Sequence, residues 1–216
     1  MKIVAVMPIK MNNERCPGKN TRMLGNKPLI QYQLEAMKAA GIADEIYVYC
    51  STDEIEPYLT DGVIFLKRSA ELDLPTSNFT QIFNAFVACV EADIYIYFHA
   101  TAPFVKPQTI RHCTEAVLSG AYDSAFCAEK IQDYLWQDGA ALNFDPENVP
   151  RSQDLKPIYR ETSGIYVIPK ATWMTCSRRI GRRPYIAEVD FAEAVDINTE
   201  EDFKKAQALK GMANNG

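Results

Sequence analysis

Three basic side chains, those of Lys10, Arg15 and Lys19, fall within ten residues of one polar loop that follows the first apolar stretch of the chain. Pro17 and Gly18 impose a turn inside this loop, and glycine lets an anion come close to the backbone amides. Three cations beside such a turn suit a triphosphate, because charge-assisted hydrogen bonds to phosphate are strong. Composition alone leaves a second interpretation equally open, that of a solvated basic loop without a ligand.

The absence of several sequence motifs excludes some classes of nucleotide and metal site. It contains no Gly-x-Gly-x-x-Gly dinucleotide motif and no Gly-x-x-x-x-Gly-Lys-Ser/Thr P-loop. It also lacks the Asp-x-Asp pair that many metal-dependent glycosyl transferases place at the nucleotide. None of the six cysteines forms a Cys-x-x-Cys pair, so we expect no structural zinc site.

Strand and helix patterns alternate along most of the chain, and these elements determine where the basic residues of the first loop lie. Strands are expected at 2–8, 46–50, 63–66, 94–98, 124–127, 163–168 and 185–189, and helices at 28–40, from 52, at 79–91, 107–118, 170–176 and from 199. This alternation predicts a doubly wound α/β fold with a mostly parallel sheet. Ligands of such sheets bind beyond the carboxyl ends of the strands, which selects 8–20, 50–54, 99–104 and 195–199.

Residues 130–158 break the alternation, because they carry Trp136, Gly139 and two prolines without a long period. This segment predicts an inserted hairpin or a substrate lid. The remaining length suits one domain over 1–212, followed by a frayed tail at 213–216.

The overall charge excludes some classes of partner. The net charge is −5 and the pI is about 5.2, which argues against broad nucleic-acid binding. No apolar run reaches the length of a membrane span, so no membrane partner is expected. The chain enters its first strand without a signal-peptide pattern, and we expect a cytoplasmic protein.

Five segments of the chain match one known family in order. They are 8–20 (PIKMNNERCPGKN, followed by LGNKPLI at 24–30), 66–72 (LKRSAEL), 99–104 (HATAPF), 161–166 (ETSGIY) and 195–203 (VDINTEEDF). Together they resemble the acylneuraminate cytidylyltransferases, which make CMP-activated sialic acids and related nonulosonates. The resemblance implies a nucleotidyltransferase fold of the nucleotide-diphospho-sugar transferase type, the substrate CTP, the cofactor Mg²⁺ and a homodimer.

The resemblance also implies roles for individual residues. The residues that would bind the nucleotide are Pro8, Lys10, Arg15, Gly18, Lys19, Asn20, Arg68 and Thr101. Lys10, Lys19 and Asp196 would be catalytic, and Asp196 with Asn198 would hold the metal. His99, Thr101, Arg160 and Glu161 would contact the sugar.

The chain departs from the family pattern at three places. The glycine- and serine-containing phosphate loop is replaced by 11–15 (MNNER), and a glutamine is replaced by His99. The second metal-binding aspartate is Asn198, whose neutral oxygen binds Mg²⁺ more weakly than a carboxylate. The site would then hold one ion or recruit an acidic residue from 188–193.

Several candidate residues have both a functional and a structural interpretation. His99 ends the central strand, where it is either a site residue or a hydrogen-bonded structural histidine. Arg151 or Arg160 could bind a sugar carboxylate through two hydrogen bonds, and Glu161 could accept one from a sugar hydroxyl. Plain salt bridges explain these three residues equally well. The basic run at 178–183 suits a solvated face or a subunit contact.

The implied activity is that of a cytidylyltransferase. A sugar-acid hydroxyl attacks the α-phosphate of CTP and pyrophosphate leaves, with catalysis by positioning and charge stabilisation. The partners are CTP, a small sugar acid and a second copy of the chain. Two alternatives stay open: 3-deoxy-manno-octulosonate or a sugar phosphate with CTP or another nucleotide, and a nucleotide-binding homologue without activity, which the Asn198 departure motivates.

Overall fold

The computed structural model describes residues 1–213. The main sheet contains β1 (Ile3–Ile9), β4 (Glu45–Cys50), β5 (Val63–Lys67), β6 (Ile94–Phe98), β7 (Ser124–Ile131), β10 (Ile158–Pro169) and β11 (Pro184–Val189). Two short pairs are β2 (Met23–Leu24) with β3 (Lys27–Pro28) and β8 (Trp136–Gln137) with β9 (Ala140–Ala141). The helices are α1 (Leu29–Ala40), α2 (Phe79–Cys89), α3 (Pro107–Leu118), α4 (Lys170–Cys176) and α5 (Glu200–Ala213), with 3₁₀ helices η1 (Lys19–Thr21), η2 (Asp53–Tyr58), η3 (Ala70–Asp73) and η4 (Ser152–Asp154).

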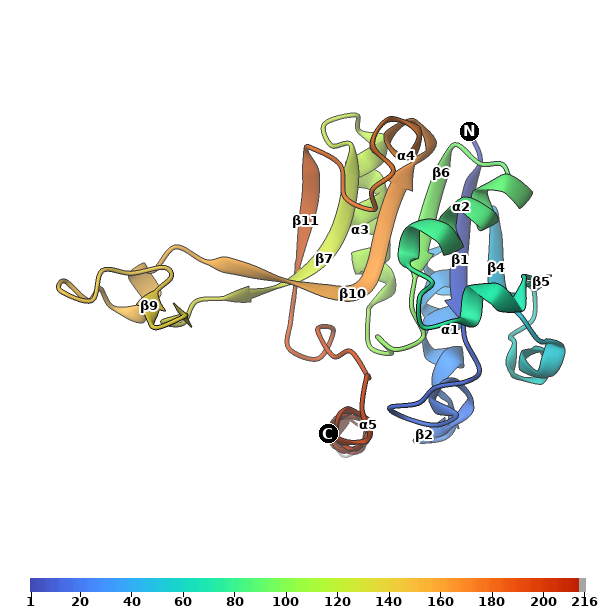
Figure 1. The fold of residues 1–216 in the computed structure, drawn as a ribbon, viewed down its shortest axis with the longest axis horizontal. Helices are drawn as coiled ribbons and strands as arrows, with labels where there is room; N and C mark the ends of the chain where they lie inside the picture. Colours follow the sequence, from blue (N-terminus) through green and yellow to red (C-terminus); the bar gives the residue numbers. More distant parts are fainter. Residues whose placement is uncertain (214–216) are drawn as a thin grey trace.

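The strand order of the main sheet is β11-β7-β10-β6-β1-β4-β5 (Figure 1). All neighbouring strands pair in parallel except β10, which runs antiparallel to both β6 and β7. The predicted mostly parallel α/β sheet is therefore confirmed. The carboxyl ends of β1, β4 and β6 meet at one edge of this sheet, because these strands point the same way.

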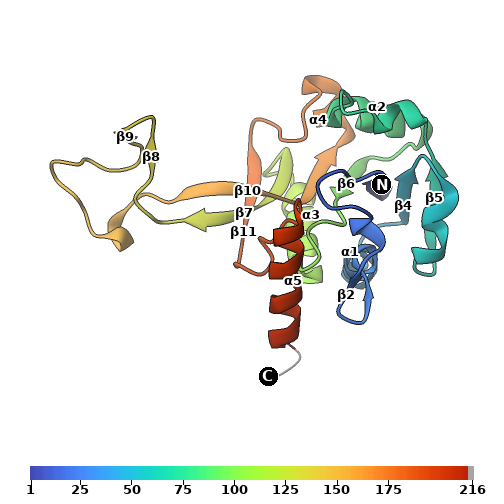
Figure 2. The ribbon, with the colours of Figure 1, turned by 60° about the horizontal axis from the view of Figure 1, so that its bottom comes forward.

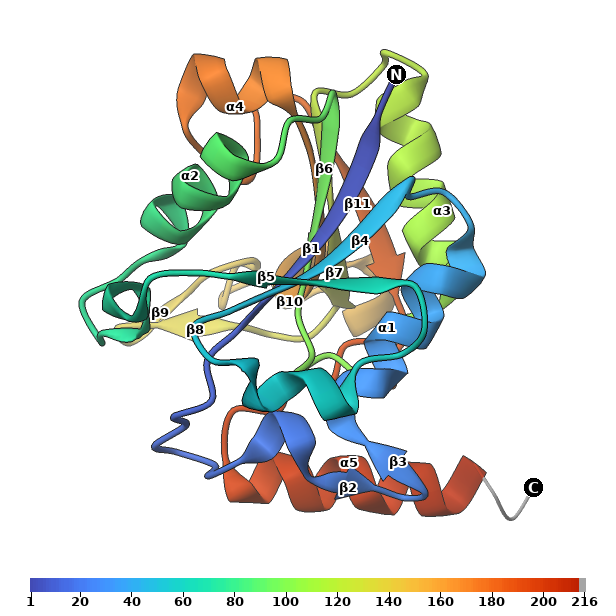
Figure 3. The same ribbon diagram turned by 90° about the vertical axis from the view of Figure 1, so that its right-hand side faces the viewer.

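Helices cover both faces of the sheet, as the doubly wound prediction requires (Figure 3). Alternate residues of β6 point to opposite faces. Ile96 and Phe98 belong to a core with α1 and α3, whereas Tyr95 and Tyr97 belong to a core with α2 and α4. All four are at most 3 % exposed, which explains why β6 has a continuous apolar sequence.

A third, smaller core joins α5 to the start of the chain. Ile197 and Phe203 pack there with Leu24 and Leu29, and all four are buried. Helix α5 lies beside β2 in this region (Figure 3). Asp202 fixes the start of α5, since its Oδ2 accepts hydrogen bonds from the backbone amides of 198 and 199, at 3.1 and 2.9 Å.

The segment 130–158 forms an arm. Strands β7 and β10 continue beyond the sheet as a two-stranded ribbon, and β8 and β9 form a small hairpin farther out. The arm extends away from the rest of the sheet (Figures 1 and 2). The expected hairpin is present, and it does not fold over the carboxyl ends of the central strands.

The observed elements differ from the sequence patterns in a few places. The strand expected at 163–168 runs from Ile158 to Pro169, and the helix expected from residue 52 is the short 3₁₀ helix η2, which contains Pro57. Helix α5 includes Ala213, and the rest of the expected tail, 214–216, lies outside the described residues. Within residues 1–213, no helix is long and apolar enough to cross a membrane.

Replacement of Phe83 by alanine should destabilise the fold. Phe83 is fully buried, and its ring centroid lies 4.6 Å from that of Trp173 and 5.4 Å from that of Tyr95. We expect the free energy of unfolding to fall by about 3–5 kcal/mol, measured by urea denaturation. Met174→Ala, at a 70 % exposed position of α4, should change it by less than about 0.5 kcal/mol, and equal effects of the two variants would contradict the described core.

Candidate active site

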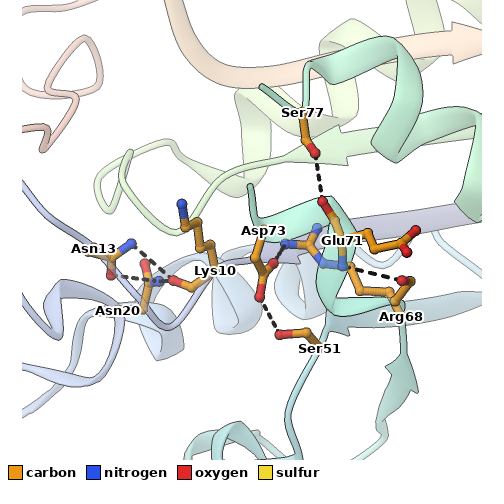
Figure 4. A network of polar contacts seen from close by, with 9 residues as sticks. Lys10, Asn13, Asn20, Ser51, Arg68, Glu71, Asp73 and Ser77 are labelled. Carbon is orange, nitrogen blue, oxygen red and sulfur yellow. Dashed lines mark hydrogen bonds and ion pairs between the residues drawn. The ribbon is translucent and has the colours of Figure 1, made fainter. Parts of the chain in front are cut away.

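The loop after β1 is fixed by one buried amide side chain. Asn20 is 5 % exposed, and its Nδ2 donates to the carbonyl oxygen of Lys10 at 2.9 Å and to Oδ1 of Asn13 at 3.4 Å. The Nδ2 of Asn13 donates to the same Lys10 carbonyl at 3.0 Å (Figure 4). These bonds fold the loop back on the end of β1. Asn20 therefore shapes the loop, and its direct contact with nucleotide stays a prediction.

The backbone of this loop is open to an anion. Gly18 adopts the left-handed conformation at φ +63° and starts the η1 turn. Within the described chain, the amide groups of 12–15 donate to no hydrogen-bond acceptor. Unpaired amides on an exposed loop can bind phosphate oxygens, as the sequence predicts.

A second segment faces the loop from the start of α5. Both backbone groups of Ile197 are bound: its carbonyl oxygen accepts from Nζ of Lys19 at 2.9 Å, and its amide donates to the carbonyl oxygen of Thr101 at 2.8 Å. The Ile197 side chain is fully buried. Its neighbours Asp196 and Asn198 remain half-buried and meet each other, with Nδ2 of Asn198 donating to Oδ2 of Asp196 at 2.7 Å.

Two cavities adjoin the Asp196–Asn198 pair, with volumes of about 430 and 350 Å³. The first, of about 430 Å³, is lined by Lys10, Asn12, Asn13, Glu14, Arg15, Cys16, Lys19, Pro75 and Asn198. It contains all three predicted phosphate-binding cations, so the structure brings these together. The Arg15 side chain reaches from the loop to Asn198, with its Nη2 3.4 Å from Oδ1 of Asn198.

The second cavity, of about 350 Å³, contains Asp196 and more apolar side chains. It is lined by Arg160, Phe191, Ala194, Val195, Asp196, Asp202, Lys205, Ala208 and Leu209. Both volumes suit small-molecule sites. Because Asn198 lines the first cavity and its hydrogen-bonded partner Asp196 lines the second, a group bound between them could contact ligands in both.

The cations of the first cavity differ in environment. Burial lowers the pKa of Lys19, and the nearby carboxylate of Asp196 opposes this shift. Lys19 is also held by the Ile197 carbonyl, whereas the ammonium group of Lys10 contacts no acceptor within the described chain. The ammonium group of Lys10 is therefore less constrained by protein contacts than that of Lys19.

The Asp196 side chain fits a metal ion that takes most of its ligands from elsewhere. Its Oδ1 is buried and lacks a hydrogen-bond partner. No group of three His, Cys, Asp or Glu side chains within residues 1–213 could form a complete protein cage. Mg²⁺ commonly keeps several waters and binds one or two carboxylates together with substrate phosphates. Asp196 Oδ1 suits this mode, and the Asn198 amide oxygen already contacts Arg15.

Arg68 lies behind the first cavity and not on its surface. Its side chain is 2 % exposed, and Nη2 lies 2.5 Å from Oδ1 of Asp73 (Figure 4). Asp73 also accepts a hydrogen bond from Ser51, which joins the ends of β4 and β5 to the segment before Pro75. Nε and Nη1 of Arg68 are buried without a partner. Its direct contact with nucleotide stays a prediction, and the sequence did not indicate its partner Asp73, five residues later, or the bond from Ser51 to Asp73.

His99 follows β6 on the same sheet face as Tyr97. Its Nδ1 lies 2.5 Å from the carbonyl oxygen of Ser163. The ring packs edge-on against Tyr97 and Tyr166, with centroids 5.1 and 6.2 Å away. The hydroxyl of Tyr166 donates to Oε1 of Glu161 at 2.5 Å. The structure therefore places Tyr166 in contact with both Glu161 and His99.

The predicted sugar-binding pair Arg160 and Glu161 is split by the pleat of β10. Successive strand residues point to opposite faces. Arg160 pairs with Glu129 and lines the second cavity, whereas Glu161 pairs with Arg179 at 2.6 Å. Arg179 lies over the Tyr166 ring, 4.7 Å from its centroid. Its sequence position in a basic run did not reveal this partner, because the loop after α4 brings it there.

The remaining predicted residues have backbone roles or peripheral positions. Pro8 is half-buried within β1 and lines neither cavity, and Thr101 contributes its carbonyl oxygen to the contact with Ile197. Arg151 pairs with Asp154 on the arm, at 2.7 Å. The salt-bridge interpretation of Arg151 agrees with this contact.

Comparison with solved structures shows the same fold. The CMP:2-keto-3-deoxy-manno-octonic acid synthetase, complexed with CTP, superposes with a TM-score of 0.71 at 19 % identity, over 99 % of this chain and 100 % of that one. The 4-diphosphocytidyl-2C-methyl-D-erythritol synthase of Anaerococcus prevotii gives a TM-score of 0.68 at 11 % identity, over 97 % and 98 % of the two chains.

Comparison with curated proteins gives relatives whose names include a sugar acid. The N-acylneuraminate cytidylyltransferase of Streptococcus agalactiae serotype V is 23 % identical over 214 residues, covering 94 % of this chain and 52 % of that protein. The pseudaminic acid cytidylyltransferase of Campylobacter jejuni serotype O:23/36 is 26 % identical over 224 residues, covering 97 % and 96 %. The chain thus spans about half the length of the streptococcal relative. A family model described as cytidylyltransferase matches residues 4–214, and the chain belongs to that family.

Proposed function

We propose that this protein transfers CMP from CTP to the hydroxyl group of a nonulosonic acid and releases pyrophosphate. The observation that carries this proposal is the first cavity, where Lys10, Arg15 and Lys19 face Asn198 and its partner Asp196. Membership of the cytidylyltransferase family supports the nucleotide, and the names of the relatives support the sugar class.

In this proposal the triphosphate lies in the first cavity. Lys10 and Lys19 neutralise its charge, and the free amides of 12–15 donate to phosphate oxygens. Arg15 exchanges its 3.4 Å contact with the neutral Asn198 for a stronger, charge-assisted contact with phosphate. Catalysis then depends on positioning and on charge stabilisation of the leaving pyrophosphate.

The sugar acid lies in the second cavity, on the other side of the Asp196–Asn198 pair. Phe191 and Val195 supply apolar contact, and Arg160 supplies a guanidinium group for the carboxylate. Arg160 already pairs with Glu129 and is held in place by that contact. A hydroxyl group beside Asp196 would then face the α-phosphate from the opposite cavity.

The proposal includes one Mg²⁺ ion bound by Asp196 Oδ1 and by the nucleotide. The support is the buried, unpartnered Oδ1 atom. When bound, such an ion supplies neutralising charge to the phosphates. Asn198 orients Asp196 by donating to its other oxygen, so the asparagine departure from the family leaves a single protein carboxylate at the ion.

We also propose a homodimer that forms through the arm. The arm carries exposed apolar side chains far from the sheet: Tyr134 (40 % exposed), Trp136 (58 %), Leu142 (53 %) and Val149 (57 %) (Figure 1). Clustered exposed apolar side chains mark interaction surfaces. A second copy of the chain would bury them.

The proposed activity predicts a CMP-sugar product. We would incubate the protein with CTP, Mg²⁺ and, separately, N-acetylneuraminic, pseudaminic, N,N′-diacetyllegionaminic and 3-deoxy-manno-octulosonic acid. Mass spectrometry should detect a CMP-sugar from one of the three nonulosonic acids, with an equal amount of pyrophosphate. Product from the octulosonate alone would change the substrate class. CTP binding without any product would instead support the nucleotide-binding homologue.

The metal proposal predicts opposite effects of two substitutions. Asn198→Asp adds a second carboxylate and should lower the Mg²⁺ concentration for half-maximal rate roughly tenfold. Asp196→Asn removes the charged ligand and should lower kcat/KM about 100-fold or more. Initial rates over a Mg²⁺ titration measure both. An unchanged Mg²⁺ dependence in both variants would contradict a metal site at this pair.

The dimer proposal predicts a weaker assembly when Trp136 is removed. Sedimentation velocity should show the 24.3 kDa chain as a dimer, and Trp136→Ala should raise the dimer dissociation constant about tenfold or more. Met174→Ala, which also removes an exposed apolar side chain, should not change it. A monomeric native protein at micromolar concentration would contradict the proposal.

A further inference from the structure

The segment between β11 and α5 supplies one wall of the second cavity. It spans residues 190–199, which contain neither strand nor helix (Figure 1). Phe191, Ala194, Val195 and Asp196 of this segment line the cavity, and Asp196 carries the buried Oδ1 without a partner. Because no regular backbone ladder fixes this segment, side-chain contacts must hold the cavity wall in place.

Glu193 lies in the middle of this wall but lines neither cavity. It is only 5 % exposed. Its Oε2 accepts hydrogen bonds from the backbone amide of Lys106 at 2.9 Å and from Oγ1 of Thr109 at 2.6 Å. Its Oε1 lies 3.0 Å from Nζ of Lys106. These contacts offset the cost of burying a carboxylate, and all of them bind Glu193 to the start of α3.

The start of α3 depends on this distant carboxylate. Lys106 is the N-cap residue, its side chain makes no capping hydrogen bond, and Pro107 has no amide hydrogen. Glu193 supplies the missing cap, and its charge is favourable at a helix N-terminus. Asp190 joins the network, since its Oδ1 accepts from the Glu193 amide at 2.9 Å and its Oδ2 pairs with Lys106 at 2.6 Å. Both carboxylates are thus paired with Lys106, which argues against either one as a second metal ligand.

A second anchor follows four residues later. The amide of Ile197 donates to the carbonyl oxygen of Thr101 at 2.8 Å. Glu193 and Ile197 are therefore both bound to the same stretch of chain, 101–109, which connects β6 to α3 and forms the first turn of that helix. Asp196 lies between these two anchors, so its position depends on both.

We propose that Glu193 is a positioning residue for the sugar acid and for Asp196, an inference that rests on the proposed function. Glu193 acts by holding the wall of the second cavity against α3. Without its carboxylate, Phe191 and Asp196 lose a fixed backbone, and the second cavity loses its defined shape. The β1 loop at the first cavity is fixed separately by Asn20. Loss of Glu193 should therefore weaken the binding of sugar acid and of metal, but not that of metal-free CTP.

Glu193→Gln tests this separation. The variant keeps the shape of the side chain, but its amide nitrogen cannot accept hydrogen bonds and its charge is lost. KM for the nonulosonic acid that the native protein uses should rise about tenfold, and the Mg²⁺ concentration for half-maximal rate should rise with it. The Kd for CTP without Mg²⁺, measured by calorimetry, should stay within about twofold. A merely structural role would lower kcat through loss of folded protein and would change none of these three values.

Thr109 provides a matched pair of variants that leaves Glu193 itself in place. Thr109 lines neither cavity. Thr109→Val removes the hydroxyl donor to Oε2 and should raise KM for the sugar acid about threefold, whereas Thr109→Ser keeps the donor and should retain the native KM.

Asp123→Asn is the control for loss of a loop anchor elsewhere. The Asp123 carboxylate accepts from the backbone amides of 182 and 183, at 2.7 and 3.0 Å, and so holds the segment that precedes β11. This variant should lower the urea midpoint of unfolding and leave KM for the sugar acid unchanged.

Hydrogen exchange provides a readout that does not depend on activity. In Glu193→Gln, the amides of 190–197 should exchange about tenfold faster or more, because their segment is released from α3. The amides of 12–20 should exchange at the native rate.

Three results would overturn the proposal. Native KM, Mg²⁺ dependence and hydrogen exchange in Glu193→Gln and Thr109→Val would exclude a positioning role and leave the proposed function intact. An equal rise of KM for the sugar acid in Asp123→Asn would show a general effect of instability. Absence of any CMP-sugar from the native protein would overturn the proposed function itself, and with it the role of Glu193 toward a sugar acid.

Discussion

The site depends on the backbone of Ile197 being bound from two directions. Lys19 holds its carbonyl oxygen and Thr101 holds its amide, so the loop after β1, the end of β6 and the start of α5 are joined at one residue. The buried Ile197 side chain fixes the third core, and its two neighbours meet between the cavities. A lysine expected to act on phosphate therefore also has a structural role, which connects nucleotide binding to the geometry of Asp196.

This arrangement separates charge in a way that suits nucleotidyl transfer. Cations and free amides surround the first cavity, an apolar wall and Arg160 border the second, and one carboxylate with an unpartnered oxygen lies between them. The two substrates of a transfer reaction would then approach Asp196 from opposite sides.

The sequence predicts the α/β class and the position of the first cavity, because buried strands are apolar runs and ligands bind beyond their carboxyl ends. It does not predict the burial of Arg68 against Asp73, which lies five residues later, because the path of that short segment is not encoded in a simple pattern. It also does not predict the contact of Arg179 with Glu161, which depends on the path of the loop after α4. The separation of Arg160 from Glu161 follows from strand pleat, but only once β10 is known to extend to residue 158. The contact of His99 with Ser163 likewise depends on the antiparallel pairing of β10 with β6.

We propose that the triphosphate of CTP occupies the cavity between the β1 loop and Asn198. A crystal structure with CTP and Mg²⁺ would show where the triphosphate binds. We expect phosphate oxygens in contact with Lys10, Lys19 and the amides of 12–15, Arg15 moved from Asn198 to phosphate, and the ion on Asp196 Oδ1. A triphosphate bound elsewhere, with Arg15 still on Asn198, would contradict this proposal.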